Sequence, residues 1–184
     1  IDFGLTTPDP VLLHESLRKM SDEGIQYVAM EASSHGLDQF RLSGVKLKAG
    51  AFLNITRDHL DYHKTVENYL KAKKKFFDDL PADAFALVNK DDKNGMVMMQ
   101  NTKAKKQSFG LKKMVDFKGK IISNTIEGLE LEINGKPVWF KLIGDFNAYN
   151  LLAVYGAAVL MGEDSETVLT TLSAIKGAVA RFEL

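Results

Sequence analysis

The sequence contains no cysteine among its 184 residues. Disulfide bonds, thiolate catalysis and cysteine-ligated metals are therefore excluded, and a reducing compartment is consistent with this composition. No apolar run is long enough to span a bilayer, and the first ten residues lack the basic and apolar regions of a secretion signal. We therefore expect a cytoplasmic protein without a membrane partner.

The sequence also lacks net charge, because 24 Lys and Arg residues balance 24 Asp and Glu residues. No overall field favours nucleic acid or an acidic membrane surface. Hydrophobic residues make up 45% of the chain, enough for the core of one ordinary α/β domain. The chain begins without methionine and ends without a tail, so we expect residues 1–184 to be one domain of a longer protein.

Several catalytic motifs are missing. There is no Gly-x-x-x-x-Gly-Lys-Ser/Thr loop, which counts against a self-sufficient nucleoside triphosphate enzyme unless that loop precedes Ile1. No Gly-x-Ser-x-Gly elbow occurs, and the adjacent Ser34 and His35 point in opposite directions in extended chain, so a hydrolase pair is rejected. Only four histidines are present, which disfavours a zinc site.

Strands and helices alternate in the first half of the chain. Asp9 and Pro10 are typical of a helix start, and Gly24 can end that helix. Short apolar runs predict buried strands at 27–30, 51–55 and 85–89, with a helix at 65–79. This alternation predicts an α/β fold with a mostly parallel sheet flanked by helices.

The pattern changes after Lys112. Short strands are predicted at 117–122, 128–133 and 138–143, and Asn134-Gly135 is a strong signal for a two-residue hairpin. We therefore expect a small antiparallel subsheet at about 115–143. An apolar helix is predicted from Asn147 to Met161, and Ser165 is expected to cap a last helix that runs to about Ala174.

Polar residues gather after two of the predicted strands, at 31–35 and at 54–63. In open parallel sheets, ligands bind beyond the carboxyl ends of the strands, so these two segments predict one crevice. Glu31 and Asp58 offer hard oxygens and His59 and His63 offer imidazoles, a set that suits Mg²⁺ better than zinc. The alternative is that both segments are polar loops rich in turn-forming residues.

Lys73 is the sharpest clue in the helix at 65–79. On a helical wheel it lies at about 340° from Val66, in the middle of the apolar stripe, whereas Lys71 and Lys75 point away. A buried amine must find an anion or lose its proton, and a neutral lysine can react with carbon dioxide to give a carbamate, an oxygen ligand for Mg²⁺. The alternative is a lysine whose amine extends past the apolar face to water.

The segments Glu31-Ala-Ser-Ser-His-Gly-Leu-Asp-Gln-Phe-Arg41 and Asn54-Ile-Thr-Arg-Asp-His-Leu-Asp-Tyr-His63, followed by Lys73, resemble the Mur ligases. Thr6-Thr7-Pro8 and Gly144-Asp-Phe-Asn-Ala-Tyr-Asn150 fit as well, and the resemblance covers essentially the whole chain. It is closest to the type that adds a diamino acid, diaminopimelate or lysine, to UDP-N-acetylmuramoyl-L-alanyl-D-glutamate. The resemblance therefore implies the central, P-loop-like domain of a peptidoglycan-building amide ligase that acts through an acyl phosphate.

The resemblance also implies roles for individual residues. Lys73, when carbamylated, together with Glu31 and His59 would hold Mg²⁺. The UDP-linked muramoyl dipeptide would be bound by Thr6, Thr7, Ser33, Gln39 and Arg41. ATP would be bound by Asn54, Asn147, Asn150 and Arg181. From the residues alone, Asn147 and Asn150 could instead cap or start a helix, Gln39 and Arg41 could be solvated loop residues, and Arg181 could be a surface charge.

The chain departs from the family pattern in three ways. The phosphate loop is absent, and so are the N-terminal UDP-binding and C-terminal amino-acid-binding domains. Ala180 stands where the family usually has glycine. We expect the chain alone to be inactive, and we expect a monomer without nucleic-acid partners. The alternatives are a folylpolyglutamate-synthase-like ligase and a degenerate, non-catalytic binding module; the intact set of Glu31, His59 and Lys73 disfavours the latter.

Overall fold

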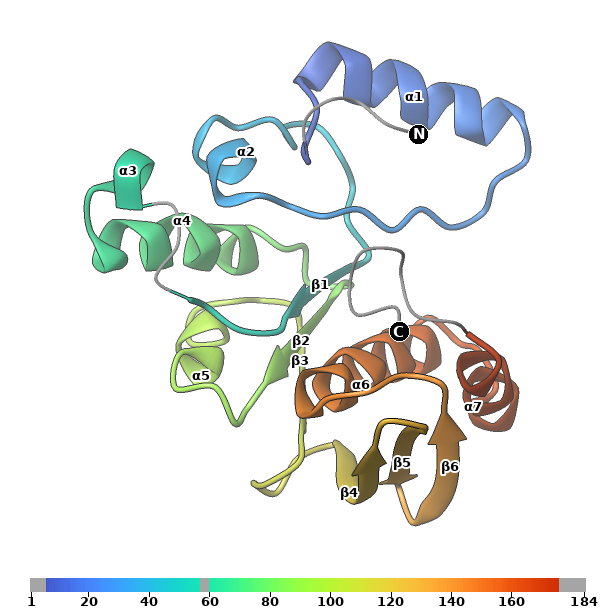
Figure 1. Ribbon diagram of the computed structural model, residues 1–184. Helices are drawn as coiled ribbons and strands as arrows, with labels where there is room; N and C mark the ends of the chain where they lie inside the picture. Colours follow the sequence, from blue (N-terminus) through green and yellow to red (C-terminus); the bar gives the residue numbers. More distant parts are fainter. Residues whose placement is uncertain (1–5, 57–59, 176–184) are drawn as a thin grey trace. The chain divides into compact units, whose positions relative to one another are not determined.

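The computed structural model describes residues 6–56 and 60–175, and the chain divides into two compact units. The first unit comprises residues 1–47 and 56–76, and the second comprises residues 48–55 and 77–184. Figure 1 shows the elements of both units along the chain.

The second unit is built on a six-stranded sheet whose strands follow one another in sequence order. Its strands are β1 (Ala49–Phe52), β2 (Phe85–Asn89), β3 (Lys105–Gly110), β4 (Phe117–Thr125), β5 (Gly128–Ile133) and β6 (Lys136–Phe140). The pairs from β1 to β4 are parallel, and those from β4 to β6 are antiparallel. The predicted parallel sheet with a small antiparallel subsheet is confirmed.

Burial follows the type of strand pairing. In β2, four of the five residues are buried, as expected for a parallel strand covered on both faces. In β5, Leu129, Leu131 and Ile133 are buried while the glutamates between them are only half-buried. Alternation of this kind is typical of antiparallel strands that bury one face.

Helix α6 (Asp145–Leu160) packs against the sheet, and Figure 1 shows it on the opposite side of β2 and β3 from α5 (Gly95–Met98). It is followed by α7 (Ser165–Ser173), which packs against α6 and β6. Together the helices and the sheet enclose the main apolar core. The largest fully buried apolar side chains of this core are Leu87, Phe109, Leu129, Leu131, Ile133, Phe140 and Leu152.

The hairpin between β5 and β6 turns at Asn134 and Gly135, as predicted. Both residues have positive φ, 49° and 84°, which is the conformation of a type I′ turn. Asn134 also accepts a hydrogen bond from the backbone N–H of Lys118 through its side-chain oxygen, at 3.1 Å. The turn therefore fixes the hairpin register and ties it to β4.

The first unit contains the helices α1 (Pro10–Asp22), α2 (Ser34–Asp38) and α3 (Leu60–His63). Helix α4 (Val66–Asp78) begins in this unit, and its last two residues belong to the second. The predicted start of α1 is confirmed, because the Asp9 carboxylate accepts hydrogen bonds from the N–H groups of Val11 and Leu12. Gly24, just beyond the helix, has a φ of 81°. In the described residues, no helix is long and apolar enough to cross a membrane.

Four element predictions were wrong in detail. Residues 27–30 form no strand and are largely exposed, because a short apolar run becomes a strand only where another strand pairs with it. The last strand is Lys136–Phe140 rather than 138–143, since Pro137 is tolerated on this outermost strand of the described sheet. Asp164, not Ser165, caps α7, and its carboxylate accepts from the N–H of Thr167 at 2.9 Å. Strand β1 starts two residues earlier than expected.

Candidate functional site

Thr7 and Ser33 are held together at the start of α2. The Thr7 hydroxyl donates to the carbonyl oxygen of Glu31 at 2.9 Å and accepts from the backbone N–H of Ser33 at 2.9 Å. Ser33 caps α2, because its own hydroxyl accepts from the N–H of Gly36 at 3.1 Å. A Cβ at Gly36 would lie 2.8 Å from the Thr7 side chain, so only glycine permits this approach. Thr6, by contrast, is exposed.

Arg41 is fixed by three hydrogen bonds from its guanidinium group. Its Nε and Nη2 atoms donate to Oε1 of Gln39 at 3.0 and 2.6 Å, and Nη1 donates to the carbonyl oxygen of Thr7 at 2.7 Å. These acceptors are neutral, and within residues 6–56 and 60–175 no carboxylate forms an ion pair with Arg41. The group is thus an oriented cation that can receive an anionic ligand.

Four of the five predicted substrate residues therefore form one hydrogen-bonded network within the first unit: Thr7, Ser33, Gln39 and Arg41. Gln39 and Arg41 lie in the turn that follows α2, where Gln39 is exposed and Arg41 is half-buried, so their assignment to a ligand stays a prediction.

Lys73 lies on α4 with its side chain half-buried, as the helical wheel predicted. Its Nζ atom lies 5.5 Å from the centre of the Tyr69 ring. Burial lowers the pKa of the Lys73 amine, and the nearby negative charge of Glu31 partly opposes that shift. The residue thus has more of the neutral, nucleophilic form than an exposed lysine has.

The donor groups at this place suit a hard cation. The carboxylate of Glu31 acts on Lys73 electrostatically, and a carbamate on Lys73 would add oxygens of the kind that Mg²⁺ prefers. The candidates Asp58 and His59 lie outside the described residues. Among the described residues, His, Asp and Glu side chains form no cluster of three that could hold a metal.

Three of the four predicted ATP residues, Asn54, Asn147 and Asn150, lie in the second unit. Asn54 is exposed two residues after β1. Asn147 donates through its side chain to the carbonyl oxygen of Ile143 at 2.8 Å, and Asn150 donates to the Asn147 side chain at 3.2 Å. Gly144 is the N-cap of α6, so neither asparagine caps the helix, but both lie in its first two turns, as the alternative of helix-starting residues expects. Arg181 lies outside the described residues.

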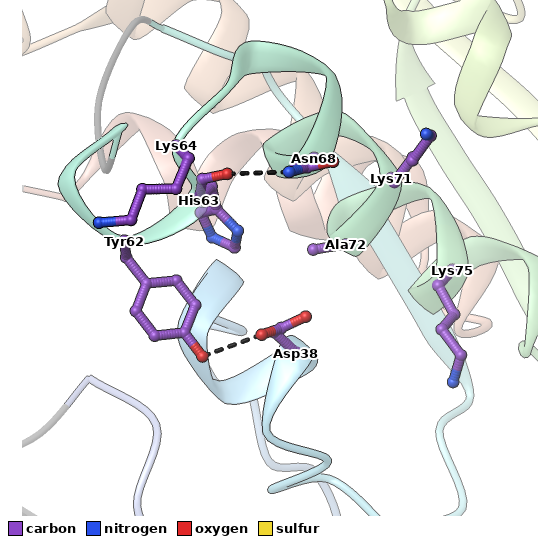
Figure 2. Close-up of a pocket in the computed structure, with 8 residues that line it drawn as sticks. All are labelled: Asp38, Tyr62, His63, Lys64, Asn68, Lys71, Ala72 and Lys75. Carbon is purple, nitrogen blue, oxygen red and sulfur yellow. Dashed lines mark hydrogen bonds between the residues drawn. The ribbon is translucent and has the colours of Figure 1, made fainter.

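Sequence reasoning missed two residues of the first-unit network, Asp38 and Tyr62. They line a cavity of about 450 Å³ together with His63, Lys64, Asn68, Lys71, Ala72 and Lys75. Figure 2 shows the Tyr62 hydroxyl bonded to Asp38, and the His63 carbonyl group bonded to Asn68 of α4. Asp38 and Tyr62 lie in the two segments, 31–41 and 54–63, that resemble the Mur ligases, but nothing in the sequence relates one residue to the other.

A second missed cluster centres on Asp91, in the second unit. Its carboxylate accepts from the backbone N–H groups of Leu111, Lys112 and Lys113 at 2.7 to 3.0 Å, and from the Tyr149 hydroxyl at 3.2 Å. Burial works to raise the pKa of Asp91, but these hydrogen bonds outweigh it and lower the pKa. Burial and the Asp91 charge raise the pKa of Tyr149 to about 12, so Tyr149 remains a donor at neutral pH.

These observations define an α/β domain that carries an oriented arginine and an inward lysine. The Mur ligase middle domain matches residues 3–158, and the chain belongs to the Mur ligase family.

Curated relatives point to one branch of that family. Over 178 residues the chain is 60% identical to a UDP-N-acetylmuramoyl-L-alanyl-D-glutamate–2,6-diaminopimelate ligase from Parabacteroides distasonis, and 56% identical to one from Bacteroides thetaiotaomicron. Each match covers 97% of this chain but 37% of the relative. The chain thus spans little more than a third of the length of these relatives.

Solved structures agree with the fold. A diaminopimelate ligase of the same name superposes with a TM-score of 0.87 at 28% identity, covering 95% of this chain and 38% of that one. MurF from Acinetobacter baumannii gives a TM-score of 0.69 at 20% identity, covering 76% of this chain and 31% of the other. The second likeness concerns the fold alone.

Proposed function

We propose that the chain is the central, nucleotide-handling domain of a cytoplasmic, ATP-dependent ligase of peptidoglycan synthesis. The ligase joins 2,6-diaminopimelate to UDP-N-acetylmuramoyl-L-alanyl-D-glutamate, in keeping with the names of the curated relatives. ATP converts the substrate carboxylate to an acyl phosphate; the amine attacks it, and ADP and phosphate leave. The two domains that would complete such an enzyme lie outside this chain.

The observation that carries the proposal is the state of Lys73. A half-buried amine with a lowered pKa, next to a carboxylate, is a suitable target for carbon dioxide. The carbamylated Lys73, Glu31 and His59 would then hold Mg²⁺, which when bound neutralises the charge of the transferred phosphate.

The remaining residues bind and orient the two substrates. Arg41, fixed on Gln39 and Thr7, supports binding of an anionic group of the UDP-linked dipeptide, together with Thr6 and Ser33. Asn54, Asn147 and Asn150 serve the nucleotide, and Arg181 meets its phosphates. Binding energy of this kind accelerates the reaction by holding the carboxylate and the phosphate in line.

The test measures ADP release by the complete gene product with UDP-muramoyl-alanyl-glutamate, ATP, Mg²⁺, bicarbonate and either diaminopimelate or lysine. We expect turnover with diaminopimelate, and a fall of at least 100-fold in Lys73→Ala. Lys19→Ala is the control, because Lys19 is exposed on α1 of the same unit, and this variant should keep its rate within about twofold.

Each failure has a separate meaning. Turnover that survives loss of Lys73 would refute the carbamate and magnesium roles but not the ligase. Turnover with lysine but not with diaminopimelate would show that lysine is the amino acid that the ligase adds. No turnover with either amino acid would refute the proposed function.

A further inference from the structure

Tyr62 connects the substrate network to a carboxylate. Its hydroxyl donates to Oδ2 of Asp38 at 2.9 Å and accepts from Nε2 of Gln39 at 3.2 Å. The opposite end of the same Gln39 amide accepts from Nε and Nη2 of Arg41. A continuous series of hydrogen bonds therefore connects Asp38 through Tyr62 and Gln39 to Arg41, all within the first unit.

The direction of each hydrogen bond between Asp38 and Arg41 follows from the Asp38 carboxylate. An ionised carboxylate can only accept, so the Tyr62 hydroxyl must donate its proton to Asp38. The Tyr62 oxygen is then available as an acceptor, which favours the NH₂ end of the Gln39 amide on that side. The carbonyl oxygen of Gln39 consequently faces Arg41, where an NH₂ group would repel the guanidinium.

Tyr62 itself is held by aromatic neighbours. The centre of its ring lies 4.1 Å from that of His35, and 4.8 Å from that of His63 in an edge-on arrangement. His63 in turn stacks on Tyr69 of α4, at 5.3 Å. The phenol is thus fixed from two sides, and Figure 2 shows its hydroxyl directed at Asp38.

We propose that Tyr62 and Asp38 are positioning residues for the Gln39–Arg41 pair, and that they set the affinity for the UDP-linked muramoyl dipeptide. This inference rests on the proposed function, because it assigns Arg41 to that substrate. Tyr62 acts through Gln39: without its hydroxyl, the amide can rotate by half a turn and present NH₂ to Arg41. The guanidinium then loses the acceptor that fixes its plane.

Removal of the hydroxyl should affect one substrate and not the other. In Tyr62→Phe we expect KM for UDP-muramoyl-alanyl-glutamate to rise about 5- to 30-fold, with KM for ATP and kcat within twofold of the parent. An equal rise of both KM values with a fall in kcat would indicate a merely structural role and overturn the inference.

Asp38 offers a second and independent variant, because its side chain is exposed and its loss should not prevent folding. Asp38→Ala removes the acceptor of the Tyr62 hydroxyl. The hydroxyl can then donate to Gln39 instead, which favours the reversed orientation of the Gln39 amide. We expect the same rise in KM for UDP-muramoyl-alanyl-glutamate, with KM for ATP unchanged. Asp38→Asn keeps a carbonyl acceptor and should restore most of the affinity. If Asp38→Asn and Asp38→Ala behave alike, the polarity argument is wrong.

The experiment uses the complete gene product, and it combines steady-state kinetics with calorimetric titration of UDP-muramoyl-alanyl-glutamate. Tyr27→Phe is the matched control, since Tyr27 belongs to the same unit and is 58% exposed. A parent protein that neither binds nor turns over this substrate would refute the proposed function and the inference with it. A working parent whose Tyr62→Phe variant binds normally would refute the inference alone.

Discussion

Replacement of Asp91 by alanine should destabilise the second unit. The substitution removes the acceptor for three consecutive backbone N–H groups, those of residues 111–113, and for the Tyr149 hydroxyl. The segment between β3 and β4 and the first turns of α6 both depend on this carboxylate. The substitution therefore removes hydrogen bonds that hold both the β3–β4 segment and the start of α6.

The magnitude follows from the number and exposure of these bonds. A hydrogen bond contributes about 1 kcal/mol net, and more when one partner is charged. Four bonds would give about 4 kcal/mol, but the N–H groups of Lys112 and Lys113 are exposed and can turn to water. We therefore expect a loss of about 2–3 kcal/mol for Asp91→Ala, and about 1 kcal/mol for Tyr149→Phe.

The assay is urea denaturation of the 184-residue chain at several pH values. Hydrogen bonding holds the pKa of Asp91 below its unfolded value of about 3.9, so the stabilisation is present above that pH and is lost as pH falls through the folded pKa. The difference in the free energy of unfolding between the parent and Asp91→Ala should thus be largest at pH 6 and become smaller toward pH 3. Asp22→Ala, at an exposed position, is the control. A difference that is absent, or that does not change with pH, would refute the reasoning.

Three further substitutions test the packing and the backbone. Leu152→Ala should lower the free energy of unfolding by about 3 kcal/mol in urea denaturation, because this side chain is fully buried; Val154→Ala, 53% exposed on the same helix, should change it little. Gly135→Ala should lower it by about 1 kcal/mol in thermal unfolding, since its φ of 84° strains any side chain. Thr7→Val removes the acceptor of the Ser33 N–H, so that amide should exchange its hydrogen at least tenfold faster; unchanged exchange would contradict the bond.

The fold was predictable where periodicity and turn chemistry agree. The run at 85–89 has the continuous apolar character of a buried parallel strand, and Asn134-Gly135 can adopt the two positive φ angles that a tight hairpin needs. The error at 27–30 has a different cause. Strand formation there depends on a pairing partner, and a local apolar run contains no information about that partner.

Residues of the candidate site could be predicted from the sequence, but their hydrogen-bond partners could not. Lys73 was found because helical geometry alone places it inward. The bonds of Tyr62 to Asp38, and of Asp91 to residues 111–113, join positions about 20 or more residues apart, and no periodicity relates such positions. These partners are set by tertiary packing, so only the three-dimensional structure reveals them.

Arg41 and Lys73, two cations of the first unit, suit different tasks, and the chemistry of each side chain explains why an arginine stands at one position and a lysine at the other. Guanidinium groups are permanently charged in proteins, and the planar fork of Arg41 meets Gln39 and Thr7 together, so its charge is oriented. The amine of Lys73 loses its proton more readily because it is buried, and only a neutral amine can attack carbon dioxide. An arginine at position 73 could not form a carbamate, and a lysine at position 41 could not bond both acceptors in one plane. Exchange of the two residue types would therefore abolish both proposed functions while leaving the net charge unchanged.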